Sequence, residues 1–509
     1  MRRRDEVTKL GHEAGLYQTA YFPSTRLTTD GLFEAGTSQS ERCVRLRHRG
    51  LYPSEKLAVV SLNQGKTRQR IVVEAPHPEP TASGWYRTSG PELPLVPQQG
   101  DVACDCLVIG GGWMGLHAAR RFAELNPQSS VILVDAGRIG DNASGRCMGF
   151  VIDLAHNPRK RDFVEDIRGN KEELYVNLEG IAYIRSAVEE HGVDCDWDPQ
   201  GKYHSAATSH GVSDLHRFSE ALNKLGQKYS WVETPEIQAI TGSRHYVKAL
   251  HHPGTILVQP AKYLKNAVNN LPENVTVHEN TAIVAVQFGA PKHICETPAG
   301  TIRASKVIIC ASGYLTRFGF FENRAIPLYT FASMTRQLTK SELSNVGNKR
   351  TYGLIPADSF GTTVRRTIDN RLFLRNVYSY ATNFKTTKQD VLRARTQQQV
   401  AFDRRWPGLS SIGFEASWGG LLTLAQNGGM VFGELAQHVY GAAFCNGTGV
   451  ARGAAFGKAV AELATGQSSA VIDILKTRAA PSRTYPRLVT SMGVRFVTAR
   501  RFRQAGAEV

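Results

Sequence analysis

The sequence predicts an α/β protein with more than one domain, and three observations support that prediction. Residues 101–137 run from an apolar strand (CDCLVIG) through a glycine turn into a helix and a second apolar strand (VILVDAG), the pattern of a βαβ unit. Residues 274–313 alternate apolar and polar side chains in the manner of strands joined by turns. The chain has 509 residues, more than a single hydrophobic core usually organises.

The composition is that of a soluble globular protein, with 41% hydrophobic and 21% charged residues. No run of about 18 apolar residues is present, so no membrane span is expected. The start, MRRRDEVTKLGHEAG, contains acidic residues and lacks the apolar centre of a secretory signal, which predicts a cytoplasmic protein. Residues 1–84 are polar and irregular and end in the linker-like APHPEPTASG, so we expect an N-terminal extension there.

The formal net charge is +16, and its distribution decides what it means. Residues 476–509 hold eight Lys and Arg residues against one acid, Glu508, which predicts a basic C-terminal tail. Outside this tail the charge is diffuse and no aromatic residues are interleaved with basic ones, so nucleic acid is not an expected partner. The eight cysteines are scattered without paired CxxC elements, so no metal site is expected.

The first glycine cluster has the GxGxxG spacing at Gly110, Gly112 and Gly115, directly after the first apolar strand. Asp135 ends the second strand, 20 residues after Gly115. In a dinucleotide site the first glycine permits the tight turn, the second lets the backbone approach the pyrophosphate, and the third lets the helix pack on the sheet. The helix N-terminus then attracts the phosphates, and the acid accepts hydrogen bonds from a ribose 2′-OH. The alternative is an ordinary structural glycine turn.

Later elements are predicted in chain order. The segment TTVRRTIDNRLFLRNVYSY is typical of a hairpin whose turn is Asp369-Asn370. Residues 386–402 have a helical pattern. Residues 439–466 combine a strand, a glycine loop and an amphipathic helix that Gly466 closes.

The GxGxxG motif does not separate NAD from FAD, so the second glycine loop, residues 446–453, decides between them. It gives another close backbone approach and another helix N-terminus. A reduced flavin accumulates negative charge around N1 and the C2 carbonyl, which a helix N-terminus stabilises, whereas nicotinamide accumulates no such anion. The loop therefore favours FAD; the alternative is a helix-capping turn near a domain boundary.

Four segments in order carry a family resemblance: IGDNASGRCMGF, TVRRTIDNRL, SWGGLLTLAQNGG and FCNGTGVARGAAFGKAVAELATG. Across residues 85–466 the chain resembles the FAD-dependent amine and amino-acid oxidases of the D-amino-acid and sarcosine oxidase type. The resemblance implies a discontinuous Rossmann-type FAD-binding domain over residues 85–180, 250–318 and 425–475. It implies a substrate domain with an antiparallel sheet over residues 181–249 and 319–424.

The resemblance also implies which residues contact FAD. We expect the pyrophosphate at Gly110, Gly112 and Gly115, and the ribose at Asp135, with Ser144, Gly145 and Arg146 in the loop beside it. We expect the adenine at Val284, and Ala311 with Gly313 to close the domain. We expect the flavin ring at Gly447, Thr448 and Gly449.

The chemistry that the resemblance implies is hydride transfer to flavin from a C–H bond beside an unprotonated amine, giving an imine that water hydrolyses. The partners are then a small-molecule amine and oxygen or another electron acceptor. A dehydrogenase passing electrons to a quinone or carrier, or an RNA-modifying protein on the same fold, are the alternatives.

Substrate choice is predicted from an absent arginine. Relatives acting on α-amino acids carry an arginine just beyond the tryptophan-glycine motif, but here Trp418 and two glycines are followed by Leu421. This segment resembles the γ-glutamylputrescine-oxidising branch, so we expect a γ-glutamylated or other N-substituted amine. Trp418 would wall the amine pocket and Arg365, or Arg366, would bind a distant carboxylate; core packing and a solvated strand face are the alternatives.

Cys147 lies in NASGRCMGF, where relatives carry asparagine or a flavin-linked histidine. A thiolate there would attack the flavin 8α-methyl position, and Arg146 would assist by lowering the thiol pKa. The alternative is a buried small residue that replaces asparagine.

Overall fold

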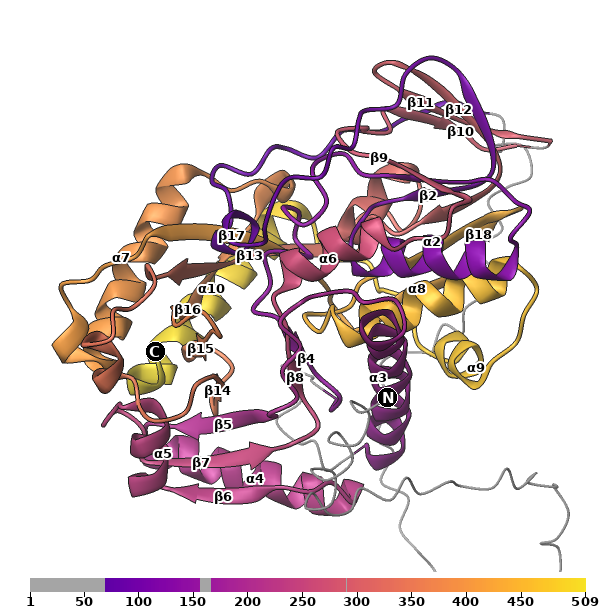
Figure 1. The fold of residues 1–509 in the computed structure, drawn as a ribbon. Coiled ribbons are helices and arrows are strands. Elements are labelled where there is room, and N and C mark those ends of the chain that lie inside the picture. Colours follow the sequence, from indigo (N-terminus) through magenta and orange to yellow (C-terminus); the bar gives the residue numbers. More distant parts are fainter. Residues whose placement is uncertain (1–68, 156–165, 290) are drawn as a thin grey trace, which may run out of the picture. The chain divides into compact units, whose positions relative to one another are not determined.

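The first sheet contains the βαβ unit expected from residues 101–137. The computed structural model describes residues 69–155, 166–289 and 291–509, which belong to one compact unit, Ser54–Val509 (Figure 1). Four parallel strand pairs form the centre of the sheet in the order β19 (Val439–Ala443), β12 (Gly300–Ile309), β2 (Val102–Ile109), β3 (Val131–Val134), β9 (Val275–His278). These strands come from three separate parts of the chain, so the predicted discontinuous α/β fold is confirmed.

An antiparallel extension continues the sheet from the first half of β12. Its strands are β11 (His293–Thr297), β10 (Ala285–Gln287) and β1 (Ile71–Val72), and β18 (Val431–Ala436) pairs with β19 on the other side. The strand β1 lies within the segment expected to be an N-terminal extension, and residues 1–68 of that segment lie outside the described residues.

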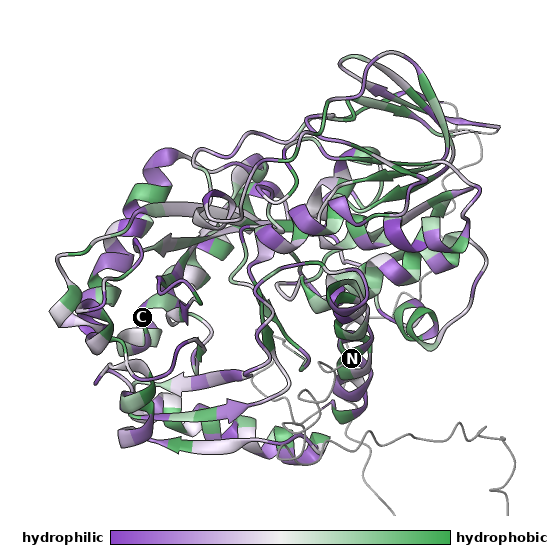
Figure 2. Ribbon diagram, viewed as in Figure 1, coloured by the Kyte–Doolittle hydropathy of each residue, from purple (hydrophilic) through white to green (hydrophobic). Residues whose placement is uncertain are grey.

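Two helices pack closely on the parallel strands. These are α2 (Trp113–Leu125) and α8 (Ala451–Ala464). A Cβ atom at Gly457 would overlap the backbone oxygen of Met114, and one at Gly453 would lie 2.9 Å from the Trp113 Cβ. The small side chains of α8 therefore allow its N-terminal turns to lie directly against the start of α2. Figure 2 shows mainly apolar residues along the strands that these helices cover.

The second sheet has eight strands and is antiparallel except where β14 pairs with β5. Its order is β17 (Ala416–Ala425), β13 (Ala325–Met334), β16 (Leu372–Tyr380), β15 (Thr363–Arg366), β14 (Tyr352–Pro356), β5 (Lys202–Ala206), β7 (Lys248–His252), β6 (Ser230–Glu233). The predicted hairpin is present as β15 and β16, and Asn370 adopts the left-handed conformation, φ 61°, that its turn needs. This sheet confirms the antiparallel-sheet part of the predicted fold.

The remaining elements connect and flank the two sheets. They are α1 (Gly84–Arg87), β4 (Phe150–Val151), α3 (Ile167–Glu189), α4 (Ser209–Leu225), α5 (Thr234–Thr241), β8 (Ile256–Leu257), α6 (Pro260–Asn269), α7 (Lys388–Arg405), α9 (Ala470–Lys476) and α10 (Arg487–Ala505), with 3₁₀ turns at Ser312–Phe318, Glu342–Asn345, Thr382–Phe384, Pro407–Leu409 and Gly506–Glu508. A capping box between Thr387 and Asp390 starts α7. No helix in the described ranges is long and apolar enough to cross a membrane.

The C-terminal residues differ from the expected basic tail, because they fold as α10 and end in a buried clasp. Helix α10 packs against β16. The Glu508 carboxylate is buried and accepts hydrogen bonds from the backbone N–H groups of Ala207 and Thr208, at 2.9 and 3.0 Å. Arg405 donates to the carbonyl oxygens of Glu508 and Val509. The end of the chain is therefore fastened to the second sheet and to α7.

Candidate active site

The turn between β2 and α2 can be built only with glycine at two positions. Gly110 has φ +106°, and a Cβ atom there would lie 2.7 Å from the carbonyl oxygen of Cys310. A Cβ atom at Gly115 would overlap the Gly110 carbonyl oxygen. Strand β12 and helix α2 thus both press on the turn, and a side chain at either glycine would displace backbone.

The Asp135 carboxylate lies against this turn at the end of β3. It accepts hydrogen bonds from the backbone N–H groups of Gly111 at 2.8 Å and Gly137 at 2.9 Å, and from the Asn142 amide at 3.1 Å. Burial is the main cause that raises its pKa, and these donors oppose the rise. Two carboxylate oxygens offer about four acceptor positions, so one is left for a ribose hydroxyl.

The loop after β3 closes over the start of α2. Gly112 is the N-cap of α2 and has no side chain to satisfy the helix N–H groups. The Ser144 hydroxyl accepts the Trp113 N–H at 3.2 Å, and a Cβ at Gly112 would overlap this hydroxyl. Gly145 packs directly on the backbone of Gly140. These contacts fit a phosphate cradle of N–H groups, a hydroxyl and the positive end of a helix.

Three further residues were expected to contact FAD or to close its domain, namely Ala311, Gly313 and Val284. Ala311 lies beside Gly110 at the end of β12, whereas Gly313 packs against the side chains of Thr423 and Phe384. Val284 was expected to meet the adenine through its backbone, but its N–H donates to the Glu296 carbonyl at 2.8 Å. Its carbonyl accepts the Val73 N–H at 2.9 Å, so both backbone groups of Val284 form hydrogen bonds with neighbouring strand segments.

The second glycine loop presents open backbone to a cavity. Asn446 adopts a left-handed conformation, and its amide donates to the carbonyls of Gly428, Gly429 and Phe444, which fixes the loop. Apart from the adjoining residues of the loop, no described atom lies within 4 Å of the position that a Cβ would take at Gly447 or at Gly449. The N-terminus of α8 follows at once, without a side-chain cap. This is room for a flat ring next to a helix N-terminus.

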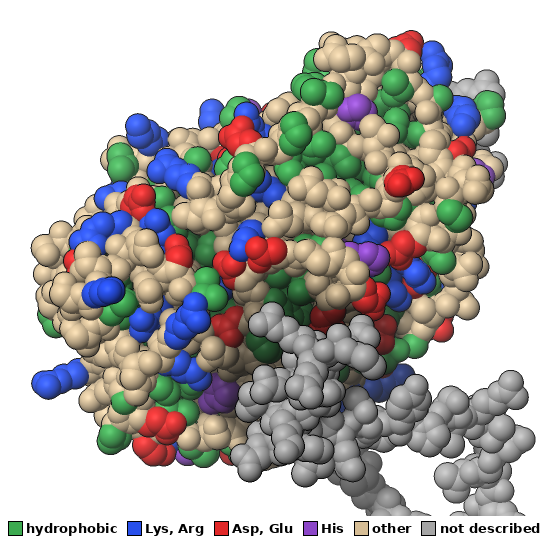
Figure 3. All heavy atoms as spheres, in the orientation of Figure 1, with side chains coloured by type: hydrophobic (Ala, Val, Ile, Leu, Met, Phe, Trp, Pro, Cys, Tyr) green, Lys and Arg blue, Asp and Glu red, His purple; other side chains and the backbone are tan. Residues whose placement is uncertain are grey.

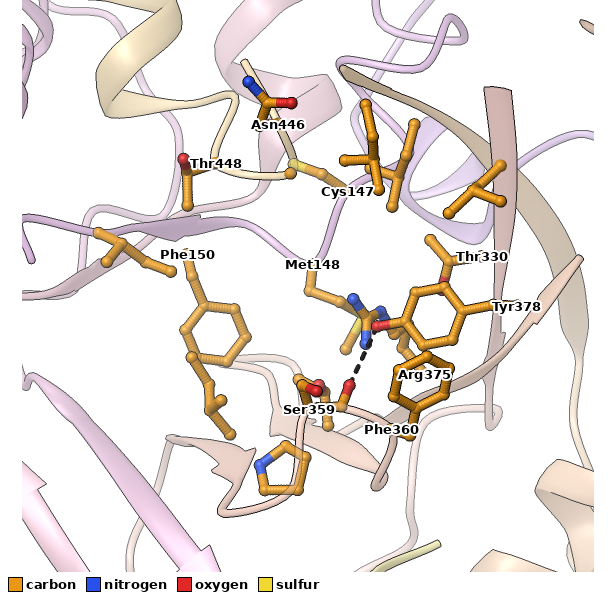
Figure 4. A pocket seen from close by; sticks show the side chains of 18 of the residues that line it. Cys147, Met148, Phe150, Thr330, Ser359, Phe360, Arg375, Tyr378, Asn446 and Thr448 are labelled. Atoms are coloured by element: carbon orange, nitrogen blue, oxygen red, sulfur yellow. Dashed lines mark hydrogen bonds between the residues drawn. The ribbon is translucent and has the colours of Figure 1, made fainter. Parts of the chain in front are cut away.

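The cavity has a volume of about 780 Å³ and lies between the second glycine loop and the second sheet. Its walls come from residues 143–150, β13, the β14–β15 loop, β16, β17, the loop 446–451, α4 and α10. Figure 4 shows Asn446, Thr448 and Cys147 on one side and Arg375, Tyr378 and Ser359 on the other. A ligand in the cavity would therefore contact the loop that follows β19 of the first sheet and, at the same time, strands of the second sheet.

Comparison with known proteins agrees with this geometry. Residues 105–463 match the family model DAO, FAD dependent oxidoreductase. The chain belongs to this family. It is 26% identical over 408 residues to the probable oxidoreductase OrdL of Rhizobium meliloti (strain 1021), covering 78% of this chain and 91% of that protein. It is 24% identical over 397 residues to gamma-glutamylputrescine oxidoreductase of Escherichia coli (strain K12), covering 77% and 90%.

A solved structure shows the same fold. The crystal structure of glycine oxidase from Geobacillus kaustophilus superposes with a TM-score of 0.61 at 18% identity, covering 76% of this chain and all of that one. The family assignment makes this chain an FAD-dependent oxidoreductase, and the two glycine loops are the parts of its structure that fit the cofactor. Among the described residues, no group of three or more His, Cys, Asp and Glu side chains is arranged to hold a metal ion.

In this FAD-dependent oxidoreductase the two residues expected to meet the substrate, Trp418 and Arg365, do not line the cavity. Trp418 is fully buried in a small apolar core, and its indole donates to the Arg146 carbonyl at 3.1 Å. The Arg365 guanidinium donates to the carbonyls of Met148 and Gly149 at 2.9 and 3.3 Å. Both side chains hold the loop 146–149 from behind, so they position this cavity wall.

Arg146 borders the cavity, but its charged end is engaged with protein acceptors. Its guanidinium donates to the Asp141 carboxylate at 2.9 Å, to the Thr81 carbonyl at 2.9 Å and to the Gly419 carbonyl at 3.2 Å. It therefore ties the loop after β3 to the N-terminal segment and to β17. Arg366 likewise donates to the carbonyls of residues 346, 347 and 349.

One arginine of the cavity wall that the sequence did not single out is Arg375 on β16. It opposes Thr363 on β15 and Ala332 on β13, and both of those residues also line the cavity. The guanidinium lies over the Tyr378 ring, 4.9 Å from its centre. An arginine that interrupts the apolar strand LFLRN was the available signal.

Lys202 on β5 is a second cationic residue of the cavity wall that was missed. Its side chain is 1% exposed, and burial lowers its pKa to about 8, although the nearby Asp153 carboxylate opposes this. Asp153 itself accepts a hydrogen bond from the buried His252 at 2.7 Å.

Cys147 lines the cavity, but Arg146 does not activate its thiol. Burial raises the pKa of the Cys147 thiol to about 11, and Arg146 is engaged elsewhere. The expected lowering of this pKa by Arg146 is therefore wrong.

Proposed function

We propose that this FAD-dependent oxidoreductase oxidises the C–N bond of an amine that carries a carboxylate away from the reacting nitrogen. A γ-glutamyl amine is the favoured example. The observation that carries the proposal is Arg375, whose planar guanidinium lines the cavity opposite the second glycine loop (Figure 4). Such a group binds a carboxylate through two parallel hydrogen bonds.

The surroundings of the Arg375 guanidinium support this role. Among the described residues its guanidinium has no carboxylate and no hydrogen-bond acceptor within bonding distance; its one polar contact is the Tyr378 ring. The Tyr378 hydroxyl donates to the Ser359 carbonyl at 3.2 Å, so the ring that supports the guanidinium is fixed. A cation held in this way, with donors to spare, favours an anionic ligand.

The rest of the cavity has the same electrostatic character. Lys202, Arg217 and Arg501 line it together with Arg375. Asp214 and Asp358 are the described carboxylates at its wall, and Asp214 is paired with Arg217, so the wall still has more cations than carboxylates. On the face seen in Figure 3, Lys and Arg side chains are also frequent over the part that carries α7. A substrate that bears a carboxylate is therefore favoured over a purely cationic polyamine.

The cofactor, when bound, supplies the hydride acceptor, and the chain's own residues prepare the substrate for it. The apolar walls from β13 and β17, including Leu328, Leu421 and Leu424, exclude water and favour the neutral amine over its ammonium form. A carboxylate bound at Arg375 fixes the orientation of the chain that leads to the nitrogen. The name of the Escherichia coli relative, gamma-glutamylputrescine oxidoreductase, agrees with this substrate class.

Anaerobic reduction of the flavin by a series of amines tests the proposal. Purified protein is mixed with γ-glutamylputrescine, putrescine or glycine without oxygen, and the loss of flavin absorbance is followed. We expect γ-glutamylputrescine to reduce the flavin fastest at equal concentration. Faster reduction by glycine or by putrescine would overturn the proposed substrate class.

A further inference from the structure

We propose that the outer face of α10 binds the surface of an anionic membrane. This face is defined here by Leu488, Val489, Met492 and Phe496, with the arginines that flank them. The inference concerns a surface outside the cavity and does not depend on which amine is oxidised.

The apolar side chains of this face are exposed. Leu488 is 73%, Val489 54%, Met492 64% and Phe496 67% exposed. Six of the fourteen exposed large apolar side chains in the described residues fall within residues 485–497. The spacing of Leu488, Met492 and Phe496, four residues apart, aligns them along one side of the helix. Such a concentration marks an interaction surface.

The inner face of α10 carries small and polar side chains, unlike the inner face of an ordinary surface helix. The residues that turn inward include Thr490, which is buried, and Thr498, which lines the cavity with Gly493 and Val494. A surface helix of a soluble protein normally buries its apolar stripe and exposes its polar one. Here the larger apolar side chains point outward, so packing against the described residues does not explain them.

The charge of α10 indicates what kind of partner binds this face. Residues 485–505 contain five arginines, at positions 487, 495, 500, 501 and 503, and no acidic residue. Within the described ranges none of these arginines forms an ion pair with a carboxylate. A symmetric contact with a second copy would bring together two faces that both carry arginines and no acidic residue, which is repulsive. Anionic lipid headgroups provide complementary charge, and each nearby arginine adds to the attraction.

The geometry suits a helix that lies on a membrane. A helix of 19 residues is about 28 Å long. Arg495 and Arg500 border the apolar stripe, and their long stems reach headgroups while Met492 and Phe496 enter the acyl boundary. Because the inner face lines the cavity, lipid binding would bring that cavity wall within about 10 Å of the membrane, one helix diameter.

Vesicle sedimentation of the full-length flavoprotein tests this. The protein is mixed with vesicles of phosphatidylcholine and phosphatidylglycerol, seven to three, or of phosphatidylcholine alone, in 100 mM NaCl. We expect binding to the mixed vesicles only. Phe496→Glu and, separately, the pair Arg500→Gln and Arg503→Gln should each weaken binding about tenfold or more. Leu392→Glu, an equally simple change at a 46% exposed leucine on α7, is the matched control and should bind like the wild type.

Each variant is checked for retained flavin absorbance, so that a folding defect is distinguished from lost lipid binding. Wild-type protein that leaves the mixed vesicles unbound would overturn the proposal, as would binding that Phe496→Glu leaves unchanged. Light scattering after size-exclusion chromatography measures the oligomeric state, which tests whether the face instead contacts a second copy. A wild-type dimer that Phe496→Glu converts to a monomer, without vesicle binding, would show that the face contacts a second copy and would also overturn it.

Discussion

Arg365 and Arg375 lie on the neighbouring strands β15 and β16, yet their surroundings give them opposite roles. Backbone carbonyls surround the Arg365 guanidinium, and burial lowers its pKa to about 10. Arg375 reaches the cavity with its hydrogen-bond donors free of described acceptors. The sequence could not distinguish them, because β15 is buried on both faces and shows no alternation that would tell which side chains face the substrate.

Replacing Arg375 tests its role. Arg375→Gln removes a charge-assisted contact worth about 1.5–3 kcal/mol, so we expect KM for γ-glutamylputrescine to rise roughly 10- to 150-fold. Steady-state or stopped-flow kinetics measure the change. Arg393→Gln, at a 71% exposed arginine side chain on α7, should leave KM unchanged. An unchanged KM in Arg375→Gln would show that the substrate carboxylate does not bind at Arg375.

Lys202 predicts a pH dependence of anion binding. Because burial lowers the pKa of Lys202 to about 8, its ammonium is charged below that pH and neutral above it. The dissociation constant of a dicarboxylate without an amine, such as glutarate, should be constant near pH 7 and rise as the pH passes 8. Titration of the flavin absorbance measures it.

The matching variant removes the titrating group. Lys202→Met should bind glutarate about tenfold more weakly at pH 7 and lose the rise above pH 8. If the wild type binds glutarate equally at pH 7 and pH 9, Lys202 does not contribute its charge to the cavity.

At the scale of elements, the glycine turns were predictable and the C-terminal helix was not. The β2–α2 turn is local, and its glycine spacing follows from contacts among Gly110, Gly115 and the adjoining strand. Helix α10 buries small or polar residues such as Thr490 and exposes apolar ones. Its apolar pattern therefore does not indicate the face that packs on the protein. Its arginines led to the prediction of a basic C-terminal tail.

The two glycine loops should respond differently to a side chain. Gly449 faces open space, so Gly449→Leu should fill the flavin position and give folded protein without bound FAD. At Gly115 a Cβ would overlap the Gly110 carbonyl, so Gly115→Ala should also destabilise the fold. Flavin absorbance and thermal unfolding followed by circular dichroism measure both effects. Full FAD content in Gly449→Leu would contradict this placement of the ring.

The C-terminal clasp predicts a measurable loss of stability. Glu508→Ala leaves the N–H groups of Ala207 and Thr208 and the Thr208 hydroxyl without their acceptor. We expect the free energy of unfolding to fall by about 1–3 kcal/mol in urea denaturation. Glu189→Ala, at the exposed end of α3, is the control. Equal stability of Glu508→Ala and the wild type would show that the clasp is dispensable.

At the scale of the whole molecule, the cavity exists only where the two sheets and α10 meet. The motifs that can be recognised in the sequence are the two glycine loops, because each is a contiguous turn. Both lie on the cofactor side of the molecule. The opposite wall combines Lys202 from β5, Arg375 from β16 and Arg501 from α10, which are far apart in the chain. Their convergence depends on strand order and on the parallel β14–β5 pair, which periodicity does not predict.

The central claim is that Arg375 makes this flavoenzyme prefer an amine with a remote carboxylate, and a two-by-two comparison tests it most directly. The second-order rate constant of anaerobic flavin reduction is measured for γ-glutamylputrescine and for putrescine, in the wild type and in Arg375→Gln. The account predicts a wild-type preference of roughly 10- to 150-fold for γ-glutamylputrescine, largely abolished in the variant, with the putrescine rate unchanged. A preference that survives in Arg375→Gln, or an equal loss of rate with both amines, would contradict it.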